Sequence, residues 1–168
     1  MSQQVHWIPA YIGLGSNLDG PADQLRRALR ALRQLANSRV QAVSSFYANP
    51  PMGPPDQPDY VNAVVGLLTS LSPELLMTEL QGIERDIGRL RNDAQRWGPR
   101  KIDLDILAYG SRIVDHANLR IPHPGISDRN FVLFPLLELA PELVIPGFGT
   151  VRKLAEHSDR TTLQVLNE

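Results

Sequence analysis

The chain has 168 residues, a formal net charge of −1, 42% hydrophobic residues and 21% charged residues. That length fits a single domain of residues 1–168 with a core of its own, and a charge near zero argues against general nucleic-acid binding, which normally requires a basic balance. The sequence has no cysteine, which excludes disulfides, thiolate metal sites and cysteine nucleophiles.

Residues 1–6 show no basic region followed by an apolar run, and no segment approaches the length that spans a membrane. We therefore expect a soluble cytoplasmic protein with neither membrane nor nucleic-acid partners. Lys101 and Lys153 are its only lysines. The bias toward arginine suits bidentate phosphate contacts, although a GC-rich genome would produce the same bias.

The first part of the chain predicts a strand, a helix and a second strand. Apolar residues alternate over residues 8–14, and Gly15-Ser16-Asn17 follows as a tight exit. A helix is predicted over residues 21–36, where Pro21 suits the first position and leucines recur at helical spacing. Its arginines fall mostly on the other face, which we interpret as solvated. Residues 40–47 are rich in β-forming residues and predict a strand.

Residues 49–58 contain five prolines, which forbid regular structure and make a stiff loop. Such a loop is either a rigid connector or part of a site, and the sequence leaves both readings open. The next strand, over residues 60–69, places Tyr60 and Asn62 on one face. An aromatic ring beside a carboxamide can stack on a flat heterocycle and hydrogen-bond to it, but these residue types on a strand more often have no such role.

A second helix is predicted to begin at Ser72-Pro73 and to end at Gly88. The polar segment 91–96 that follows is expected to be a mobile loop. After it, Gly110 turns the chain into a hairpin that spans residues 113–121.

The most informative stretch is residues 96–107. Alternation from residue 102 onward predicts a strand with Asp103 and Asp105 on one face, about 7 Å apart. Just upstream, Arg96 and Arg100 flank a Trp-Gly-Pro turn. Carboxylates that can hold one or two divalent cations beside arginines that can clamp phosphate are what polyphosphate chemistry needs. The alternative is the wet face of an antiparallel sheet beside a solvated arginine cluster.

The remainder of the chain offers one chemical candidate. His123 lies between two prolines, and its role stays open between a site and a structural turn. Asp128 is expected to cap a third helix, which Pro135 is expected to interrupt. Residues 136–168 are expected to form short helices and loops without chemical features.

The order β-α-β-β-α-β is that of a ferredoxin-like core. We therefore predict an α+β fold whose antiparallel sheet has both helices on one face, with an extra C-terminal hairpin and helices. The strands that carry Asp103, Asp105 and Tyr60 would then gather over the other face.

Six ordered blocks resemble the 6-hydroxymethyl-7,8-dihydropterin pyrophosphokinase family of folate biosynthesis, over about residues 10–146. The blocks are Gly15-Ser16-Asn17-Leu18, Ser44-Ser45-Phe46-Tyr47, Asp56-Gln57-Pro58-Asp59-Tyr60-Val61-Asn62-Ala63, Arg96-Trp97-Gly98-Pro99-Arg100, Asp103-Leu104-Asp105 and Pro122-His123-Pro124. The resemblance implies an ATP-dependent transferase that moves the β,γ-pyrophosphate of ATP onto the pterin hydroxymethyl group and releases AMP. The small-molecule partners would be ATP and the pterin, and the enzyme is expected to be a monomer.

The resemblance also implies the site residues. Asp103 and Asp105 would bind two Mg²⁺ ions and, with Arg89 and Arg100, form the catalytic set. Tyr60 and Phe131 would sandwich the pterin ring. The full pterin set would be Asn49, Pro50, Met52, Tyr60, Asn62, Trp97 and Phe131. The ATP set would be Gln81, Glu84, Arg91, Arg96, Trp97, Arg100, Ile106, His123 and Arg129. No strong general base is expected.

The sequence departs from the family pattern at Asn49, where a threonine is usual, and at Pro124, where a tyrosine is familiar. Asn118 and Arg120 also differ from the residues expected near the adenine. These departures bear on the adenine contacts and not on the aspartate pair.

Three other classes of function remain open from the residues alone. Another Mg²⁺-dependent nucleotide enzyme, such as a nucleotidyl transferase or hydrolase, would leave Tyr60, Asn62 and the proline-rich loop unexplained. An RNA-binding module can use a similar sheet, but Asp103 and Asp105 would place negative charge where RNA lies. An interaction protein would leave the Arg-Trp-Gly-Pro-Arg block unexplained.

Overall fold

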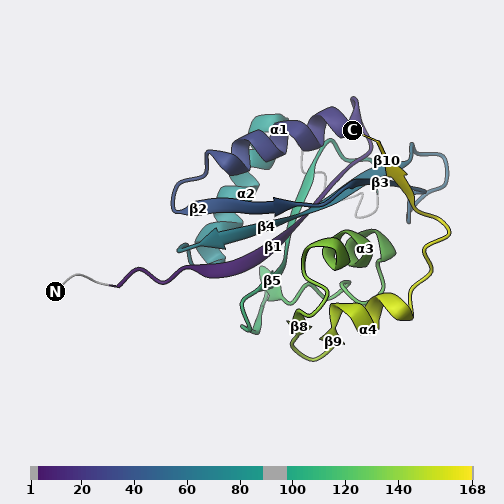
Figure 1. Ribbon diagram of the computed structural model, residues 1–168. Coiled ribbons are helices and arrows are strands. Elements are labelled where there is room, and N and C mark those ends of the chain that lie inside the picture. Colours follow the sequence, from purple (N-terminus) through teal and green to yellow (C-terminus); the bar gives the residue numbers. More distant parts are fainter. Residues whose placement is uncertain (1–3, 89–97, 168) are drawn as a thin grey trace.

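The computed structural model describes residues 4–88 and 98–167, and Figure 1 shows its ribbon. Its main sheet has the strand order β10-β3-β4-β1-β5, and β2 also pairs with β4. All of these pairs are antiparallel. The elements of the sheet and its two first helices are β1 (Ile8–Ser16), α1 (Pro21–Arg33), β2 (Ser38–Val43), β3 (Phe46–Asn49), β4 (Tyr60–Thr69), α2 (Pro73–Ile87), β5 (Asp103–Tyr109) and β10 (Gln164–Leu166). The predicted ferredoxin-like α+β fold is confirmed.

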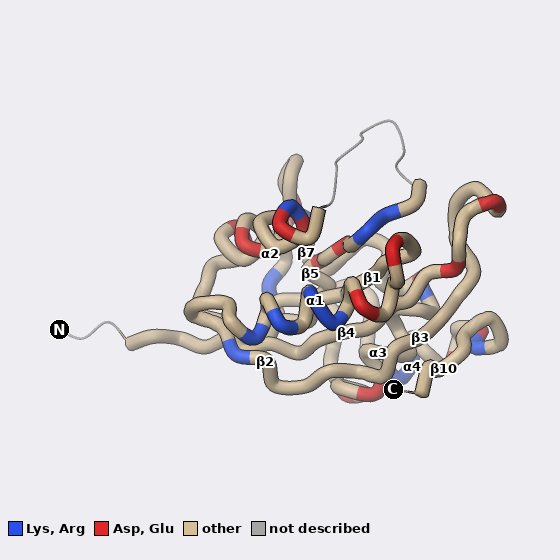
Figure 2. Tube along the Cα trace, turned by 90° about the horizontal axis from the view of Figure 1, so that it is seen from above, with Lys and Arg blue, Asp and Glu red and all other residues tan. Residues whose placement is uncertain are grey.

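Helices α1 and α2 cover one face of this sheet, as Figure 1 shows. Pro21 occupies the start of α1, and its apolar stripe, including Leu25 and Leu32, is buried against the strands. The Ser72 hydroxyl accepts a hydrogen bond from the Leu75 N–H and caps α2. Gly88 ends α2 with a φ of 101°, in the left-handed region that favours glycine. The arginines of α1 are exposed, as expected for a solvated face, and Figure 2 marks them in blue.

The other face of the sheet is covered by α3 (Asn130–Leu139) and α4 (Val151–Glu156), with the short hairpin β8 (Val144–Ile145) and β9 (Gly149–Thr150) beside them. A shift in the β1–β5 register lets Leu107 and Ala108 both face this second core. Val64 packs there against the apolar side of α3. The hairpin predicted over residues 113–121 is confirmed as β6 (Val114–His116) and β7 (Leu119–Ile121).

The predicted strand over residues 40–47 is wrong, because the chain breaks at Ser44. Both halves pair with β4, but Val43 lies opposite Val65 and Tyr47 opposite Asn62, so the broken strand has one residue more than its partner over that interval. The Ser44 hydroxyl accepts from the Val64 N–H at 2.9 Å and so satisfies the backbone at the break. The result is two short strands where β-propensity alone predicts one.

Three predictions for the C-terminal part of the chain are also wrong. Arg129, not Asp128, occupies the N-cap of α3, and its side chain makes no capping bond. Pro135 does not interrupt the helix, which continues to Leu139; the helix loses one backbone donor there, and the proline ring is buried. Residues 164–166 form β10, which pairs with β3 and extends the main sheet. In the part of the chain that the structure describes, no helix is long and apolar enough to cross a membrane.

Candidate active site

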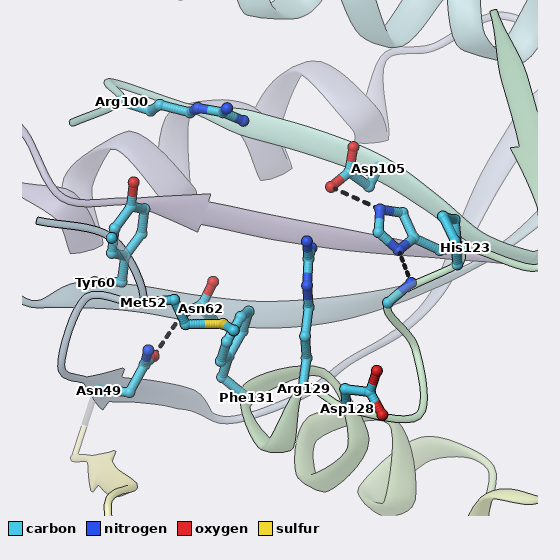
Figure 3. A pocket seen from close by; sticks show the side chains of 13 residues that line it. Asn49, Met52, Tyr60, Asn62, Arg100, Asp105, His123, Asp128, Arg129 and Phe131 are labelled. Atoms are coloured by element: carbon cyan, nitrogen blue, oxygen red, sulfur yellow. Dashed lines mark hydrogen bonds and ion pairs between the residues drawn. The ribbon is translucent and has the colours of Figure 1, made fainter. Parts of the chain in front are cut away.

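A cavity of about 500 Å³ lies between the main sheet and the N-terminal end of α3, and Figure 3 shows the side chains that line it. Even-numbered residues of β4 face this side, while Val61 and Ala63 face the α1–α2 core, as predicted. The lining residues are Asn49, Met52, Gly53, Tyr60, Asn62, Arg100, Asp105, His123, Pro124, Gly125, Asp128, Arg129 and Phe131. The cavity thus joins residues that are far apart in the sequence.

One end of the cavity presents two buried carboxamides. The Asn62 Nδ2 on β4 donates to the Asn49 Oδ1 on β3 at 2.5 Å, and the Asn49 Nδ2 donates to the Pro50 carbonyl at 3.1 Å. Asn62 lies opposite Gly15 of β1, where a Cβ would come within 2.7 Å of the Asn62 Oδ1. The glycine therefore lets the carboxamide sit against β1. Each carboxamide offers two donors and one acceptor, so both can also bond to a ligand.

Aromatic and thioether groups wall this carboxamide end. Tyr60 begins β4, and its hydroxyl donates to the Gly98 carbonyl at 3.0 Å. Phe131 comes from the first turn of α3, and Met52 comes from the proline-rich loop. Figure 3 shows Met52, Phe131 and Asn62 at the same end of the cavity. The loop therefore contributes Met52 and Gly53 to the cavity wall.

The other end of the cavity is charged and is built around β5. Asp103 and Asp105 lie on one face of that strand, and the Arg100 Nη1 forms an ion pair with the Asp103 Oδ2 at 2.9 Å. Burial, and then the negative charge of Asp103, raise the pKa of Asp105 to about 7. Asp105 therefore binds its proton more tightly than an exposed carboxylate does.

His123 is held as a neutral hydrogen-bond donor. The Gly125 N–H donates to its Nδ1 at 3.0 Å, which puts the ring proton on Nε2. That Nε2 lies 3.7 Å from the Asp105 Oδ2. Burial, and then the positive charge of Arg129, lower the pKa of His123 to about 4. At neutral pH, His123 therefore offers an N–H to the cavity without adding charge.

Asn17 ties the two ends of the cavity together, although it lies outside the lining. Its Oδ1 accepts from the Arg100 N–H at 2.8 Å, and its Nδ2 donates to the Gln57 Oε1 at 3.1 Å and to the Pro58 carbonyl at 3.0 Å. Asn17 is 1% exposed. One buried side chain thus links the exit of β1, the proline-rich loop and the segment that carries Arg100.

Some residues implied by the resemblance lie beside this cavity. Pro50 lines an adjoining cavity of about 300 Å³. Ile106 lines a third cavity, also of about 300 Å³, which shares Asp105, His123 and Pro124 with the first. Asn118 and Arg120, where the sequence departs from the family pattern, line this third cavity.

Two further residues, Glu84 and Gln81, line none of the three cavities. Glu84 is buried on α2, and its Oε1 accepts from the Leu104 N–H at 2.8 Å, so it anchors β5 between the two aspartates. Gln81 is half-buried on α2. Arg89, Arg91, Arg96 and Trp97, together with the loop expected at residues 91–96, lie outside the described residues.

The sequence reasoning missed four residues that line the main cavity: Gly53, Pro124, Gly125 and Asp128. A signal existed for Gly125, since a glycine that follows Pro-His-Pro marks a tight turn. A Cβ at Gly125 would lie 2.8 Å from the Arg129 Nε, so the glycine makes room for that guanidinium. Asp128 carried no signal for a cavity, because its position before a helix suggested a cap.

The aspartate pair fits a hard divalent cation. Within residues 4–88 and 98–167, no three or more His, Cys, Asp or Glu side chains gather round a possible metal position. Mg²⁺ is commonly held by one or two carboxylates, with phosphate oxygens and water as the other ligands. Asp103 and Asp105 supply such a pair, and the pKa of Asp105 is raised first by burial and then by the charge of Asp103.

Residues 11–141 match the sequence model of a family described as 7,8-dihydro-6-hydroxymethylpterin-pyrophosphokinase. A 2-amino-4-hydroxy-6-hydroxymethyldihydropteridine pyrophosphokinase of Haemophilus influenzae is 50% identical over 149 residues, which cover 89% of this chain and 92% of that protein. The protein of the same name from Pseudomonas aeruginosa is 47% identical over 136 residues, which cover 81% of this chain and 83% of that protein.

A solved structure with a similar fold is described as an HPPK-DHPS in complex with substrates. It aligns with a TM-score of 0.75 at 13% identity and covers 96% of this chain. The present chain spans about half of that longer one, since the match covers 47% of it. At this identity the likeness concerns the fold alone.

Proposed function

The chain belongs to the 7,8-dihydro-6-hydroxymethylpterin-pyrophosphokinase family, and on that basis we propose that it transfers pyrophosphate from ATP to the hydroxymethyl group of 6-hydroxymethyl-7,8-dihydropterin. Enzymes of this family are ATP-dependent diphosphotransferases of folate synthesis. The observation that carries the proposal is the single cavity that joins an end of carboxamides and aromatic rings to an end of carboxylates and arginines. A pterin suits the first end and a nucleotide triphosphate the second.

The carboxamide end would hold the pterin. Tyr60 and Phe131 would stack on the two faces of the ring, and Asn62 and Asn49 would hydrogen-bond to its polar edge. The mutual bond between the two carboxamides supports this role, because it fixes their orientation before the ligand arrives. Pro50 and Met52 would complete this end from the proline-rich loop.

The charged end would hold the triphosphate, with Mg²⁺ bound by Asp103 and Asp105. When bound, Mg²⁺ supplies charge neutralisation and orientation of the phosphate oxygens. Glu84 supports this arrangement, because its bond to the Leu104 N–H fixes β5 between the two aspartates. Arg100 would donate to phosphate after leaving its ion pair with Asp103.

Other donors would complete the nucleotide site. Arg129 and the Nε2–H of His123 face the same cavity and would bond to phosphate oxygens. The third cavity, beyond His123, would take the nucleoside end of ATP and includes Ile106. By the family resemblance we also assign nucleotide roles to Gln81, Arg89, Arg91, Arg96 and Trp97, and a place beside the pterin to Trp97.

The reaction needs little chemistry from the protein beyond this positioning. The hydroxymethyl oxygen attacks the β-phosphorus, the bond from that phosphorus to the α,β-bridging oxygen breaks, and AMP leaves with that oxygen. The hydroxyl proton passes to solvent after attack, so the reaction requires no strong general base. Holding an alcohol in line with a phosphorus atom gives a large rate gain by proximity alone.

Calorimetry tests both halves of the proposal. A stable pterin analogue is titrated into the protein with and without Mg²⁺ and a non-hydrolysable ATP analogue, and AMP release is measured separately with the true substrates. We expect the pterin analogue to bind, and to bind more tightly when the nucleotide is present. Nucleotide binding without pterin binding would refute the pterin half and leave the phosphate half standing.

We further propose that the chain works as a monomeric single domain of residues 1–168 in the cytoplasm. Strands near both ends of the chain, β1 and β10, belong to one sheet, which supports one domain. Light scattering that gives twice the mass of one chain at assay concentration would refute the monomer.

A further inference from the structure

Helix α3 runs along β3 with three of its side chains on one stripe. Phe131, Phe134 and Glu138 are three and four residues apart, which places them on the same side of a helix. On β3, Tyr47 and Asn49 share a face because they are two residues apart. Phe131 lines the main cavity with Asn49, and Phe134 packs in one apolar cluster with Tyr47. Glu138 lies at the other end of the stripe.

The Glu138 carboxylate joins the two elements by hydrogen bonds. One of its oxygens accepts from the Tyr47 hydroxyl, and the other accepts from the Ser45 N–H at 2.9 Å. A carboxylate acceptor makes such bonds stronger than a neutral one. Burial, and then the bond to Glu138, raise the pKa of Tyr47, so its hydroxyl keeps its proton and remains a donor at neutral pH.

We propose that Glu138 and Tyr47 are positioning residues that fix the register between α3 and β3 and so set the width of the pterin end of the cavity. The proposal rests on the proposed function for the identity of the ligand. Tyr47 lies directly opposite Asn62 in the β3–β4 pair, and Asn62 donates to Asn49. Strands β3 and β4 therefore carry the carboxamides, while α3 carries Phe131 to meet the same ligand.

The radius of a helix gives the distance that a side chain moves when the helix rotates. A side chain on the surface of a helix lies about 5–6 Å from the helix axis, so a rotation of α3 by about 20° moves it by about 2 Å. The apolar contacts of α3 with the sheet are non-directional and define the rotation of the helix less sharply than hydrogen bonds do. Two hydrogen bonds to one carboxylate hold the helix at one rotation. A displacement of that size would separate Phe131 from a ring stacked against it.

Tyr47→Phe is the cleanest test, because it removes the hydroxyl and keeps the buried ring that packs on Phe134. Glu138 is exposed, so water can solvate it in this variant and the protein folds. We expect the dissociation constant of the pterin analogue to rise roughly fivefold to tenfold, which corresponds to about 1.0–1.4 kcal/mol. The kcat and the KM for ATP stay within about twofold of the wild-type values, a split that general destabilisation would not produce.

The Glu138 variants grade the effect. Glu138→Ala removes both acceptors and weakens pterin binding at least as much as Tyr47→Phe. Glu138→Gln keeps one acceptor oxygen and falls between Glu138→Ala and the wild type. If the two side chains act through one bond, the double variant Tyr47→Phe/Glu138→Ala loses no more affinity than Glu138→Ala alone.

Glu142→Ala is the matched control. Glu142 is also exposed, but it accepts from the Arg152 Nε at 2.7 Å and ties the chain to α4, not to β3. This variant keeps the wild-type affinity for the pterin analogue. Amide hydrogen exchange in the first turn of α3, measured without ligand, becomes faster in Tyr47→Phe and Glu138→Ala and stays normal in Glu142→Ala.

Pterin affinity and amide hydrogen exchange together distinguish a failure of the proposed function from a failure of the positioning role. If wild-type protein binds no pterin analogue while exchange in α3 responds as described, the proposed function is wrong and the positioning role stands. If wild-type protein binds the analogue, and Tyr47→Phe and Glu138→Ala bind it equally well, the positioning role is overturned.

Discussion

We expect Asp105→Asn to stabilise the metal-free protein at pH 8 while it abolishes activity. Burial and the charge of Asp103 raise the pKa of Asp105 from 3.8 to about 7, while the charges of Arg129 and Arg100 oppose that shift only in part. A shift of about three units corresponds to about 4 kcal/mol at 1.36 kcal/mol per unit. The side chain is 35% exposed, so solvent screening reduces this figure, and we expect a gain of about 1–2 kcal/mol.

The sign of the pH dependence follows from the direction of the shift. Between about pH 4 and pH 7 the folded state binds more protons at Asp105 than the unfolded state does. The free energy of unfolding of the wild-type protein therefore falls as the pH rises through this range. The advantage of Asp105→Asn is therefore full above pH 7 and shrinks toward pH 4. Asparagine is uncharged at every pH.

Thermal unfolding in a chelator measures the effect. For a chain of this length, 1 kcal/mol shifts Tm by about 2–4 °C, so Asp105→Asn should raise Tm by about 2–8 °C at pH 8 and by much less at pH 5. Asp103→Asn is the control, because it loses the ion pair with Arg100 and should bring no gain. A Tm for Asp105→Asn at or below the wild-type value at pH 8 would refute the charge crowding inferred for this end of the cavity.

Three further predictions concern single side chains. Asn17→Ala removes the partner of the Arg100 N–H and of Gln57, so it should lower the free energy of unfolding in denaturant by about 1–3 kcal/mol. It should also lower kcat/KM for both substrates. An unchanged kcat/KM would show that the link between the two ends of the cavity is only structural. Phe131→Leu should weaken pterin binding by about 0.5–1.5 kcal/mol in calorimetry, the value of an aromatic pair, and should leave the KM for ATP unchanged. His123→Gln keeps a donor near Nε2, and since the pKa of His123 is lowered to about 4, the variant and the wild type should have pH profiles of kcat/KM for ATP of the same shape around neutral pH. An inflection that the variant loses would contradict the neutral-donor role.

Hydrophobic periodicity was sufficient to predict the ferredoxin-like core, because each of its helices and long strands buries one face. It failed at Ser44, since the β-forming residues continue on both sides of the break and only the count of residues on β4 reveals it. It also failed at β10, where three residues are too few to show alternation and their strand conformation depends on the edge of β3. The conformation of such segments depends on pairing with a strand that is far away in the sequence.

The residues of the candidate site also divide into those that local sequence patterns predict and those that they do not. Tyr60, Asn62 and the aspartate pair could be found from residues one or two positions apart on single strands. The bond between Tyr47 and Glu138 joins residues 91 positions apart, and that of Asn17 with Arg100 joins residues 83 positions apart. No local pattern in one sequence reports such contacts. The residues that hold the cavity walls in place were therefore less predictable than the residues that face the cavity.

The two aspartates of β5 are alike in sequence, but the structure makes them unequal. Asp103 has Arg100 at 2.9 Å, a cation at every accessible pH. The nearest basic side chain that the structure records for Asp105 is His123 at 3.7 Å, and the lowered pKa of His123 keeps it uncharged at neutral pH, so this contact is not a salt bridge. Asp105 therefore carries the charge that a bound cation would relieve most. The difference in Tm between Asp105→Asn and Asp103→Asn in a chelator measures this inequality directly. Adding Mg²⁺ with a nucleotide should reverse the sign of the Tm difference between Asp105→Asn and the wild type, because only the wild-type pair of carboxylates then gains stability from the cation.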